Sequence, residues 1–219
     1  MKQGVWTNRP DYNDPLKYYR FTERFSGINN ASASAGDMDW SSSGTNQKVM
    51  LQTSTSTGAM GVKGLVAHTG TDDVSRWHQY LPSIGDVRTG MIITVRLRPQ
   101  AGAFSANTMW FYGIQNGTGS NPFQAINIEA IGIRAQSSID GKVYAVVKNG
   151  AAAVNESTVD LGAYDTTNWT TYQMRIGASS VHGYKNGVLQ GSTALGSNFD
   201  TSINSYVELM AVYNESASG

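Results

Sequence analysis

The feature that most constrains the fold is an alternation of apolar and polar residues with a period of two. In 91–98 apolar residues occupy every second position: Met91, Ile93, Val95 and Leu97. Successive side chains of a strand point to opposite faces of a sheet, so this pattern predicts a half-buried strand, which Pro99 ends. Similar runs without a sustained helical period predict strands over 18–25, 48–53, 64–69, 75–81, 108–115, 124–135, 142–148, 170–177, 180–185 and 206–213.

Four dipeptides between or beside these runs predict tight hairpin turns. Asn-Gly occurs at 116–117, 149–150 and 186–187, and Asp140-Gly141 is a similar signal. A type I′ turn needs positive φ at both central residues, which Asn and Gly tolerate. About ten short strands with such turns predict an all-β protein in which two antiparallel sheets stack as a β-sandwich.

The length of the chain suits one sandwich of this kind. Among its 219 residues we expect 18–219 to form a single domain. Residues 1–17 lack the alternation but contain Trp6 and Tyr12, which predicts an extended N-terminal arm that makes assembly contacts. Segment 26–47 is rich in Ser, Gly, Ala and Asn, and we expect a long surface loop there.

Charge and cysteine content exclude several classes of partner and site. The chain has 16 basic and 16 acidic residues, whereas a general nucleic-acid binder shows a basic excess. Cysteine is absent, which excludes disulfides, thiolate zinc ligands and a thiol nucleophile. The start of the sequence has no secretory apolar segment, and no stretch has the roughly 18 apolar residues of a membrane helix. We therefore expect no nucleic-acid partner, no membrane partner and no cofactor.

The polar residues show few patterns of a metal or nucleophilic site. His68, His78 and His182 lie far apart in the sequence, which argues against a zinc site. No Gly-x-Ser-x-Gly elbow is present. Asp72 and Asp73 are weak candidates for calcium ligands, with turn capping as the alternative. We expect no resident metal.

Two predicted strands combine several aromatic-class residues and are the best candidates for ligand contact. They contain Trp77, His78, Tyr80, Trp110 and Tyr112. Such rings can form a platform on which a sugar stacks. The alternative is that some of them, Trp110 and Tyr112 above all, are large inward side chains of the core.

The order of several segments resembles a known family. These segments are RFTERFSG, GDMDWSSSGT, GLVAHTGT, MIITVRLRP and the late hairpin NWTTYQMRIGASSVHGYKNGVLQG. The order is similar to that of the concanavalin A-like (laminin-G-like) jelly-roll domain, in particular the version found in tailed-phage virion proteins. In the hairpin the matching residues are Trp169, Tyr172, Tyr184, Asn186 and Gly187. The resemblance covers about 18–213 and implies a jelly-roll sandwich with an extended N-terminal arm.

Two departures from the resembled family bear on function. Its glycosidases carry Glu-x-Asp-x-x-Glu and its lyases Gln-Ile-His, and this chain has neither pattern. We therefore expect a protein that is not an enzyme. Such sandwiches also close with an apolar strand beside the first one, so either 205–213 is that strand or a further strand is missing from the chain.

The resemblance implies a non-enzymatic virion structural protein of a tailed phage, as a capsid decoration or fibre-type subunit. Such a protein would be made in the host cytoplasm and displayed on the particle. Its partners would be other virion proteins, copies of itself in an oligomer such as a trimer, and surface polysaccharide of the host. The alternative is a lectin-like carbohydrate-binding module, secreted or part of a larger assembly.

Overall fold

The computed structural model describes residues 34–35, 40–44, 50–53, 60–63, 74–81, 90–98, 108–115, 129–136, 140–148, 156–195 and 205–214. Side chains are described for 90–98, 109–115, 129–135, 140–148 and 156–195. The predicted arm, residues 1–17, lies outside these segments, so its conformation and its role stay predictions. Within the described segments no helix has the length and apolarity needed to cross a membrane.

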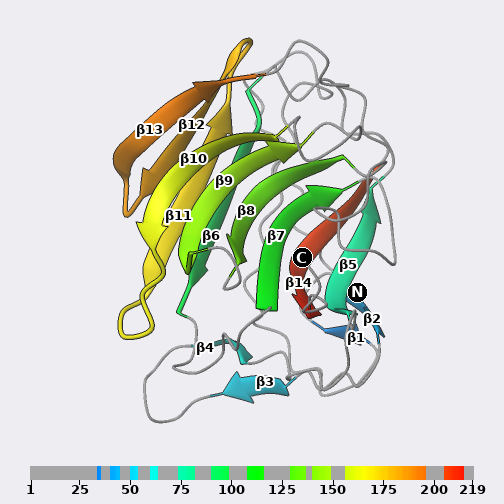
Figure 1. The fold of residues 1–219 in the computed structure, drawn as a ribbon. Helices are drawn as coiled ribbons and strands as arrows, with labels where there is room; N and C mark the ends of the chain where they lie inside the picture. Colours follow the sequence, from blue (N-terminus) through cyan, green and yellow to red (C-terminus); the bar gives the residue numbers. More distant parts are fainter. Residues whose placement is uncertain are drawn as a thin grey trace, which may run out of the picture.

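The described elements are strands, and they form two main antiparallel sheets (Figure 1). The eight-stranded sheet has the order β1-β2-β5-β14-β7-β8-β9-β10 and the four-stranded sheet the order β13-β12-β11-β6. The larger sheet contains β1 (Ser34–Ala35), β2 (Trp40–Gly44), β5 (Val74–Leu81), β7 (Thr108–Gln115), β8 (Ala130–Gln136), β9 (Lys142–Lys148), β10 (Glu156–Ala163) and β14 (Ser205–Asn214). The smaller contains β6 (Ile92–Leu97), β11 (Thr170–Ile176), β12 (Ser180–Lys185) and β13 (Val188–Ala194). A separate pair joins β3 (Met50–Thr53) to β4 (Met60–Lys63).

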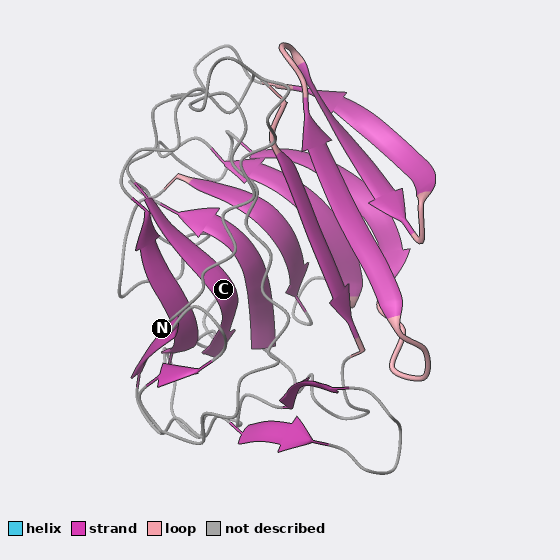
Figure 2. Ribbon diagram, turned by 180° about the vertical axis from the view of Figure 1, so that it is seen from behind, coloured by secondary structure: helices cyan, strands magenta, loops and turns pink. Residues whose placement is uncertain are grey.

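The two main sheets stack face to face, which confirms the predicted sandwich. The four-stranded sheet packs mainly against β8, β9 and β10 and lies in front of them in Figure 2. Alternate residues of the facing strands make the core, as the period of two predicts. They include Val95, Leu97, Ile131, Ile133, Val143, Ala145, Val147, Val159, Leu161, Tyr172, Met174, Ile176 and Val181.

A glycine allows the sheets to approach closely at β10 and β12. A Cβ atom on Gly183 would lie 2.6 Å from Leu161 Cδ2 and 2.8 Å from Val159 Cγ1. Carbon atoms at van der Waals contact are about 3.5–4.0 Å apart, so only a residue without a side chain fits between these two. Gly183 therefore fixes the spacing of the sandwich where β12 crosses β10.

The turn between β12 and β13 confirms the Asn-Gly prediction. Asn186 has φ 50° and Gly187 φ 81°, which are both positive, as a type I′ turn requires. Asn186 Oδ1 also accepts a hydrogen bond from Thr171 N at 2.9 Å. At 140–141 only Gly141 has positive φ, at 67°, and the turn is closed instead by the carboxylate of Asp140.

Other sequence predictions differ from the observed elements. Segment 26–47 contains β1 and β2, so the prediction of one long surface loop is wrong at these strands. Strand β10 was not predicted, because its eight residues contain few apolar side chains. The predicted strands 18–25 and 64–69 lie outside the described residues. Strand β14 pairs with β5 on one side and β7 on the other, so the candidate closing strand is internal to the larger sheet.

Candidate functional site

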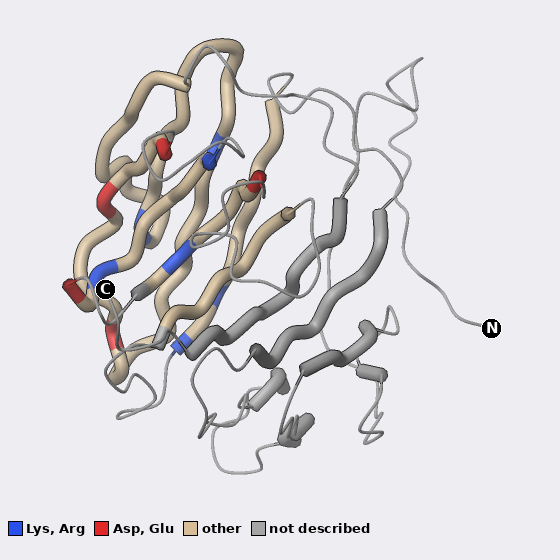
Figure 3. The backbone as a smooth tube through the Cα atoms, turned by 45° about the vertical axis from the view of Figure 1, so that its right-hand side comes forward, with Lys and Arg blue, Asp and Glu red and all other residues tan. Residues whose placement is uncertain are grey.

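The outward face of β9 and β10, which is turned away from the intersheet core, carries charged side chains in register. Lys148 pairs with Glu156, and Tyr144 pairs with Asp160. The alternating residues Val143, Ala145 and Val147 of β9 and Val159 and Leu161 of β10 belong to the core, so alternation within each strand separates the two faces. Across the described residues, charged positions are spread along the strands rather than gathered at one end (Figure 3).

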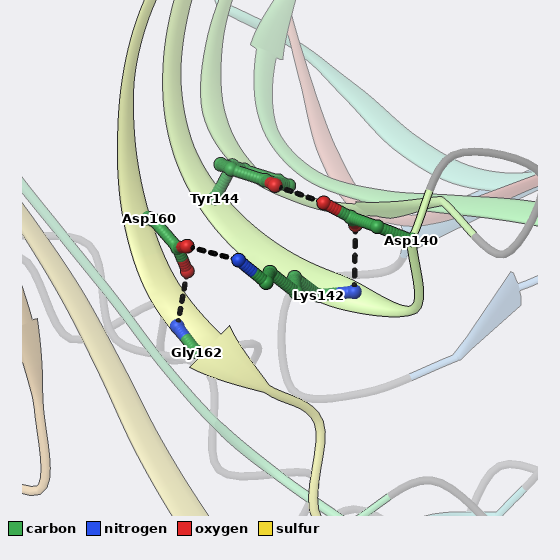
Figure 4. A network of polar contacts seen from close by, with 5 residues as sticks. All are labelled: Asp140, Lys142, Tyr144, Asp160 and Gly162. Atoms are coloured by element: carbon green, nitrogen blue, oxygen red, sulfur yellow. Dashed lines mark hydrogen bonds and ion pairs between the residues drawn. The ribbon is translucent and has the colours of Figure 1, made fainter.

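Four side chains and two backbone amides form a connected set that we call the β9–β10 network (Figure 4). Lys142 Nζ donates to Asp160 Oδ2 at 2.6 Å, and Gly162 N donates to Asp160 Oδ1 at 2.6 Å. Lys142 N donates to Asp140 Oδ1 at 3.0 Å, and the hydroxyl of Tyr144 donates to Asp140 Oδ2. Both carboxylates are thus held in place from two sides.

The charges of the network stabilise one another. The hydrogen bond from Lys142 is the main cause that lowers the pKa of Asp160, and the amide of Gly162 lowers it further. The hydrogen bond to Asp160 likewise raises the pKa of Lys142. Burial, followed by the hydrogen bond to Asp140, raises the pKa of Tyr144 to about 12. At neutral pH the network therefore holds an anionic acceptor at Asp160, an ammonium donor at Lys142 and a protonated phenol at Tyr144.

A β-bulge in β10 positions Asp160 and Gly162, which form one end of the β9–β10 network. The register with β9 shifts between Asp160 and Ala163, and Gly162 has φ 81°, which favours glycine. This conformation brings the amide of Gly162 onto the carboxylate two residues before it. Lys185 Nζ, from β12 of the other sheet, donates to Ala163 O at 2.9 Å and anchors the strand beyond the bulge.

Next to the network, toward the middle of the sheet, lies a less accessible group of charges. Arg134 Nη1 donates to Glu156 Oε1 at 3.0 Å, with only 7% and 16% of the two side chains exposed. The Arg134 guanidinium lies 6.0 Å from the centre of the Tyr144 ring. Burial lowers the pKa of Lys148, and the charge of Glu156 opposes this shift. Glu156 therefore compensates two cations on a face that excludes most solvent.

Of the predicted aromatic platform, the structure describes the side chains of Trp110 and Tyr112. Trp110 is 5% exposed and belongs to the intersheet core, because its strand position faces the smaller sheet. It therefore cannot stack on a sugar, and the core alternative is correct for this residue. Tyr112 is half-buried and packs against the same core.

The other members of the predicted platform lie on β5, whose backbone alone is described. β5 is separated from β7 by β14, so its residues do not pair with Trp110 or Tyr112. The register pairs Tyr80 with Tyr206 and His78 with Glu208. It pairs Trp77 with Met210. A ligand role for these three residues stays a prediction.

The remaining candidates lie outside the described residues. These are the arm residues Trp6 and Tyr12 and the calcium candidates Asp72 and Asp73. Within the described segments, no group of three or more His, Cys, Asp or Glu side chains is placed to hold a metal ion.

Sequence reasoning missed the β9–β10 network, although parts of it leave a signal. The sequence predicts only a turn at Asp140 and only a strand over 142–148. Glu156 and Asp160 stand four residues apart, a spacing that puts both carboxylates on one face of a strand. About 20 residues separate Asp140 from Asp160, so the sequence does not indicate that they lie near each other. The pairing of β9 with β10 brings them together.

No protein-family model matches the chain. No curated protein matches it either. Among solved structures the chain is similar to a protein of unknown function from Shewanella oneidensis MR-1. The TM-score is 0.53 at 15% identity, over 82% of this chain and 72% of that one.

Two further solved structures are similar at lower scores. One is a β-glucanase of Bacillus licheniformis, with a TM-score of 0.48 and 14% identity over 90% of this chain and 85% of that one. The other is the carbohydrate-binding module CBM66 from Bacillus subtilis, with a TM-score of 0.41 and 7% identity over 80% and 92%. At these identities the likeness concerns the fold alone, and the fold is the two-sheet antiparallel β-sandwich described above. The comparisons do not support the virion association, which stays a prediction.

Proposed function

We propose that the protein binds carbohydrate, without turnover, through the β9–β10 network. The observation that carries this proposal is the pair formed by Lys142 Nζ and Asp160 Oδ2, 2.6 Å apart, with 43% and 45% of the two side chains exposed. A sugar hydroxyl both donates and accepts hydrogen bonds. Neighbouring hydroxyls can therefore donate to the carboxylate and accept from the ammonium, which each have spare capacity.

The network is organised before any ligand arrives. Asp160 is fixed by Gly162 N, and Lys142 N is fixed by Asp140. Groups that already stand in position lose little conformational freedom on binding, so more of the interaction energy appears as affinity. The half-buried Tyr144 ring lies on the same face, opposite Asp160, and can contact the carbon atoms of a sugar.

Binding without turnover is supported by the state of the carboxylates on β10. A glycosidase needs a carboxylic acid that keeps its proton near neutral pH. The pKa of Asp160 is shifted the opposite way, mainly by Lys142. Glu156 is committed to an ion pair with Arg134. These two side chains suit the fixing of hydroxyl groups better than proton transfer.

The test is a panel of neutral oligosaccharides on an array, followed by titration calorimetry on each glycan that binds. We expect Asp160→Asn, which keeps an oxygen for Gly162 N but loses the negative charge, to weaken binding about tenfold or more. Asp165→Asn is the matched control, because Asp165 is a carboxylate in the loop after β10 that accepts from Thr167 N at 2.7 Å. Folded protein that binds no glycan on the panel, or equal losses in the two variants, would contradict the proposal.

A further inference from the structure

The outward face of the four-stranded sheet carries arginines and aromatic rings rather than ion pairs. Arg96 on β6 alternates with the core residues Val95 and Leu97, so its side chain lies on the face turned to solvent. The same alternation places Arg175 on this face of β11 and Tyr184 on this face of β12. We call the set Arg96, Arg98, Trp169, Arg175 and Tyr184 the arginine face.

The rings hold the guanidinium groups of this face. Those of Arg96 and Arg98 lie 5.8 and 5.5 Å from the centre of the Trp169 ring, and that of Arg175 lies 4.6 Å from the centre of the Tyr184 ring. Distances below about 6 Å are those of cation–π contacts. Trp169 itself is 40% exposed, so its ring serves as a support at the surface and not as a core residue.

A short chain of hydrogen bonds links the two ends of the arginine face. Arg175 Nε donates to Gln173 Oε1 at 2.8 Å, and Gln173 Nε2 donates to Thr94 Oγ1 at 2.8 Å. Thr94 stands two residues before Arg96 on β6. The middle of the face is therefore polar, uncharged and ordered, with positive charge at both ends.

The positive charge of the arginine face is not compensated by acidic side chains of the described segments. Within them, none of the three arginines forms an ion pair with a carboxylate. Asp140, Glu156 and Asp160 belong to the larger sheet or to its β8–β9 turn. Asp165, in the loop that leads to Trp169, accepts from Thr167 N and Asn168 N. Within the described segments, a chain with zero formal net charge thus holds three cations together that no carboxylate neutralises.

We propose that the arginine face binds an acidic polysaccharide, a glycan chain that carries carboxylate or sulfate groups. The guanidinium fork matches the two oxygens of such groups, and arginines held on rings have lost most of their freedom before binding. An extended chain can span a sheet face that carries charge at both ends. The class of ligand rests on the proposed function, whereas the location is independent of the β9–β10 network.

A nucleic acid is the competing occupant, and the chain fits it less well. Nucleic-acid binders carry an overall basic excess that attracts the phosphate backbone, and this chain has none. Single-stranded nucleic acid also needs open ring faces on which bases stack. Here a guanidinium already occupies one side of Trp169 and of Tyr184.

The experiment compares dextran sulfate with unmodified dextran, so that only the charge of the glycan differs, and adds polygalacturonate and a single-stranded oligonucleotide. Affinity is measured by biolayer interferometry at low and high salt. We expect dextran sulfate and polygalacturonate to bind and dextran not to bind. The triple variant R96Q/R98Q/R175Q should lose about tenfold or more, since each lost contact is a charged hydrogen bond. High salt should weaken the wild type, because exposed charges are screened.

One control variant and one pair of variants separate the arginine face from charge in general. Lys185→Gln removes a cation of the same sheet whose Nζ donates to Ala163 O, away from this face, and should leave the affinity unchanged. Trp169→Ala keeps every charge but removes the support of Arg96 and Arg98, and should weaken binding severalfold, whereas Trp169→Phe keeps a ring and most of the affinity.

Failure of this proposal can be told apart from failure of the proposed function. If neutral glycans bind through Asp160 but the acidic glycans do not bind, the arginine face is not a binding site and the function stands. If acidic glycans bind equally well to the triple variant, the location is wrong. If the oligonucleotide binds as tightly as dextran sulfate and depends on the same arginines, the ligand is not a polysaccharide.

Discussion

The outward faces of the two sheets hold their charges in different ways. On the larger sheet Lys142 meets Asp160 and Arg134 meets Glu156, so each cation has an anion beside it. On the smaller sheet the guanidinium of Arg175 rests on the ring of Tyr184, and Arg96 and Arg98 rest on Trp169.

For Arg134 the difference follows from the access of water, whereas Lys142 and Asp160 are paired although 43% and 45% of their side chains are exposed. Only 7% of the Arg134 side chain is exposed, and a charge taken out of water needs a partner of opposite sign. Arg96, Arg98 and Arg175 are exposed and stay hydrated, so folding does not require a carboxylate beside them. The paired charges on the larger sheet thus contribute both to the fold and to the binding of any ligand. The unpaired charges on the smaller sheet can bind an external anion.

The largest effect that tests this comparison should come from Glu156→Gln. The change removes the carboxylate that faces both Arg134 and Lys148, and it leaves two cations on a face with little solvent. We expect the free energy of unfolding to fall by about 3 kcal/mol, as is usual when one partner of a buried ion pair is removed. Urea unfolding at neutral pH measures it.

The control for this prediction is the double variant Arg134→Met/Glu156→Leu, which removes both charges of the pair. It should recover much of the stability lost in the single variant, because apolar side chains of similar size replace a buried pair at small cost. A loss below about 1 kcal/mol in Glu156→Gln would mean that water reaches this part of the face and that the proposed contrast does not hold.

The sandwich could be predicted from the sequence because its strands are amphipathic one by one. Met174 and Ile176 alternate with Gln173 and Arg175, so β11 is visible without any partner, and Asn186-Gly187 marks the turn that follows β12. In β7 the pattern was not decisive, because Met109, Trp110 and Phe111 are all buried in the folded chain. Alternation indicates which residues share a face, but not how many faces are covered.

The candidate site could be predicted only in part, because it depends on pairing across strands. Asp160 becomes a neighbour of Lys142 through the register of β9 with β10, which no local pattern encodes, whereas Asp140 lies only two residues before Lys142. The arginine face is nearer to the sequence, since Arg96 and Arg98 stand two apart on the polar side of β6. The contact of their guanidinium groups with Trp169 could not be predicted, because Trp169 lies in the connection between β10 and β11.

A smaller change in the free energy of unfolding should appear in alkaline solution, and this change depends on Tyr144. Burial and Asp140 raise its pKa to about 12 from the ordinary value of 10.0, so the fold favours the protonated phenol. The resulting stability is fully present below about pH 10 and is lost as the pH rises toward about 12, by on the order of 1–2 kcal/mol after allowance for partial exposure.

Tyr144→Phe isolates this effect, because it keeps the ring and removes the hydroxyl that titrates. Urea unfolding of both proteins between neutral and strongly alkaline pH should show a gap that narrows as the pH rises through this window. Parallel curves for the two proteins would mean that burial and Asp140 do not raise the pKa of Tyr144 in the folded protein.

The smallest expected change in stability is on the arginine face, and it is the sharpest test of the comparison. R96Q/R98Q/R175Q removes three charges, yet the free energy of unfolding should stay within about 0.5 kcal/mol of the wild type, since surface substitutions away from buried pairs are nearly neutral. Removing three cations that have no carboxylate partner relieves mutual repulsion, which offsets the lost contacts with Trp169 and Tyr184. The same unfolding experiment used for Glu156→Gln gives the value. A loss comparable to that of Glu156→Gln would show that the arginines hold the sheet together, and the face would then be part of the fold rather than a surface kept for a partner.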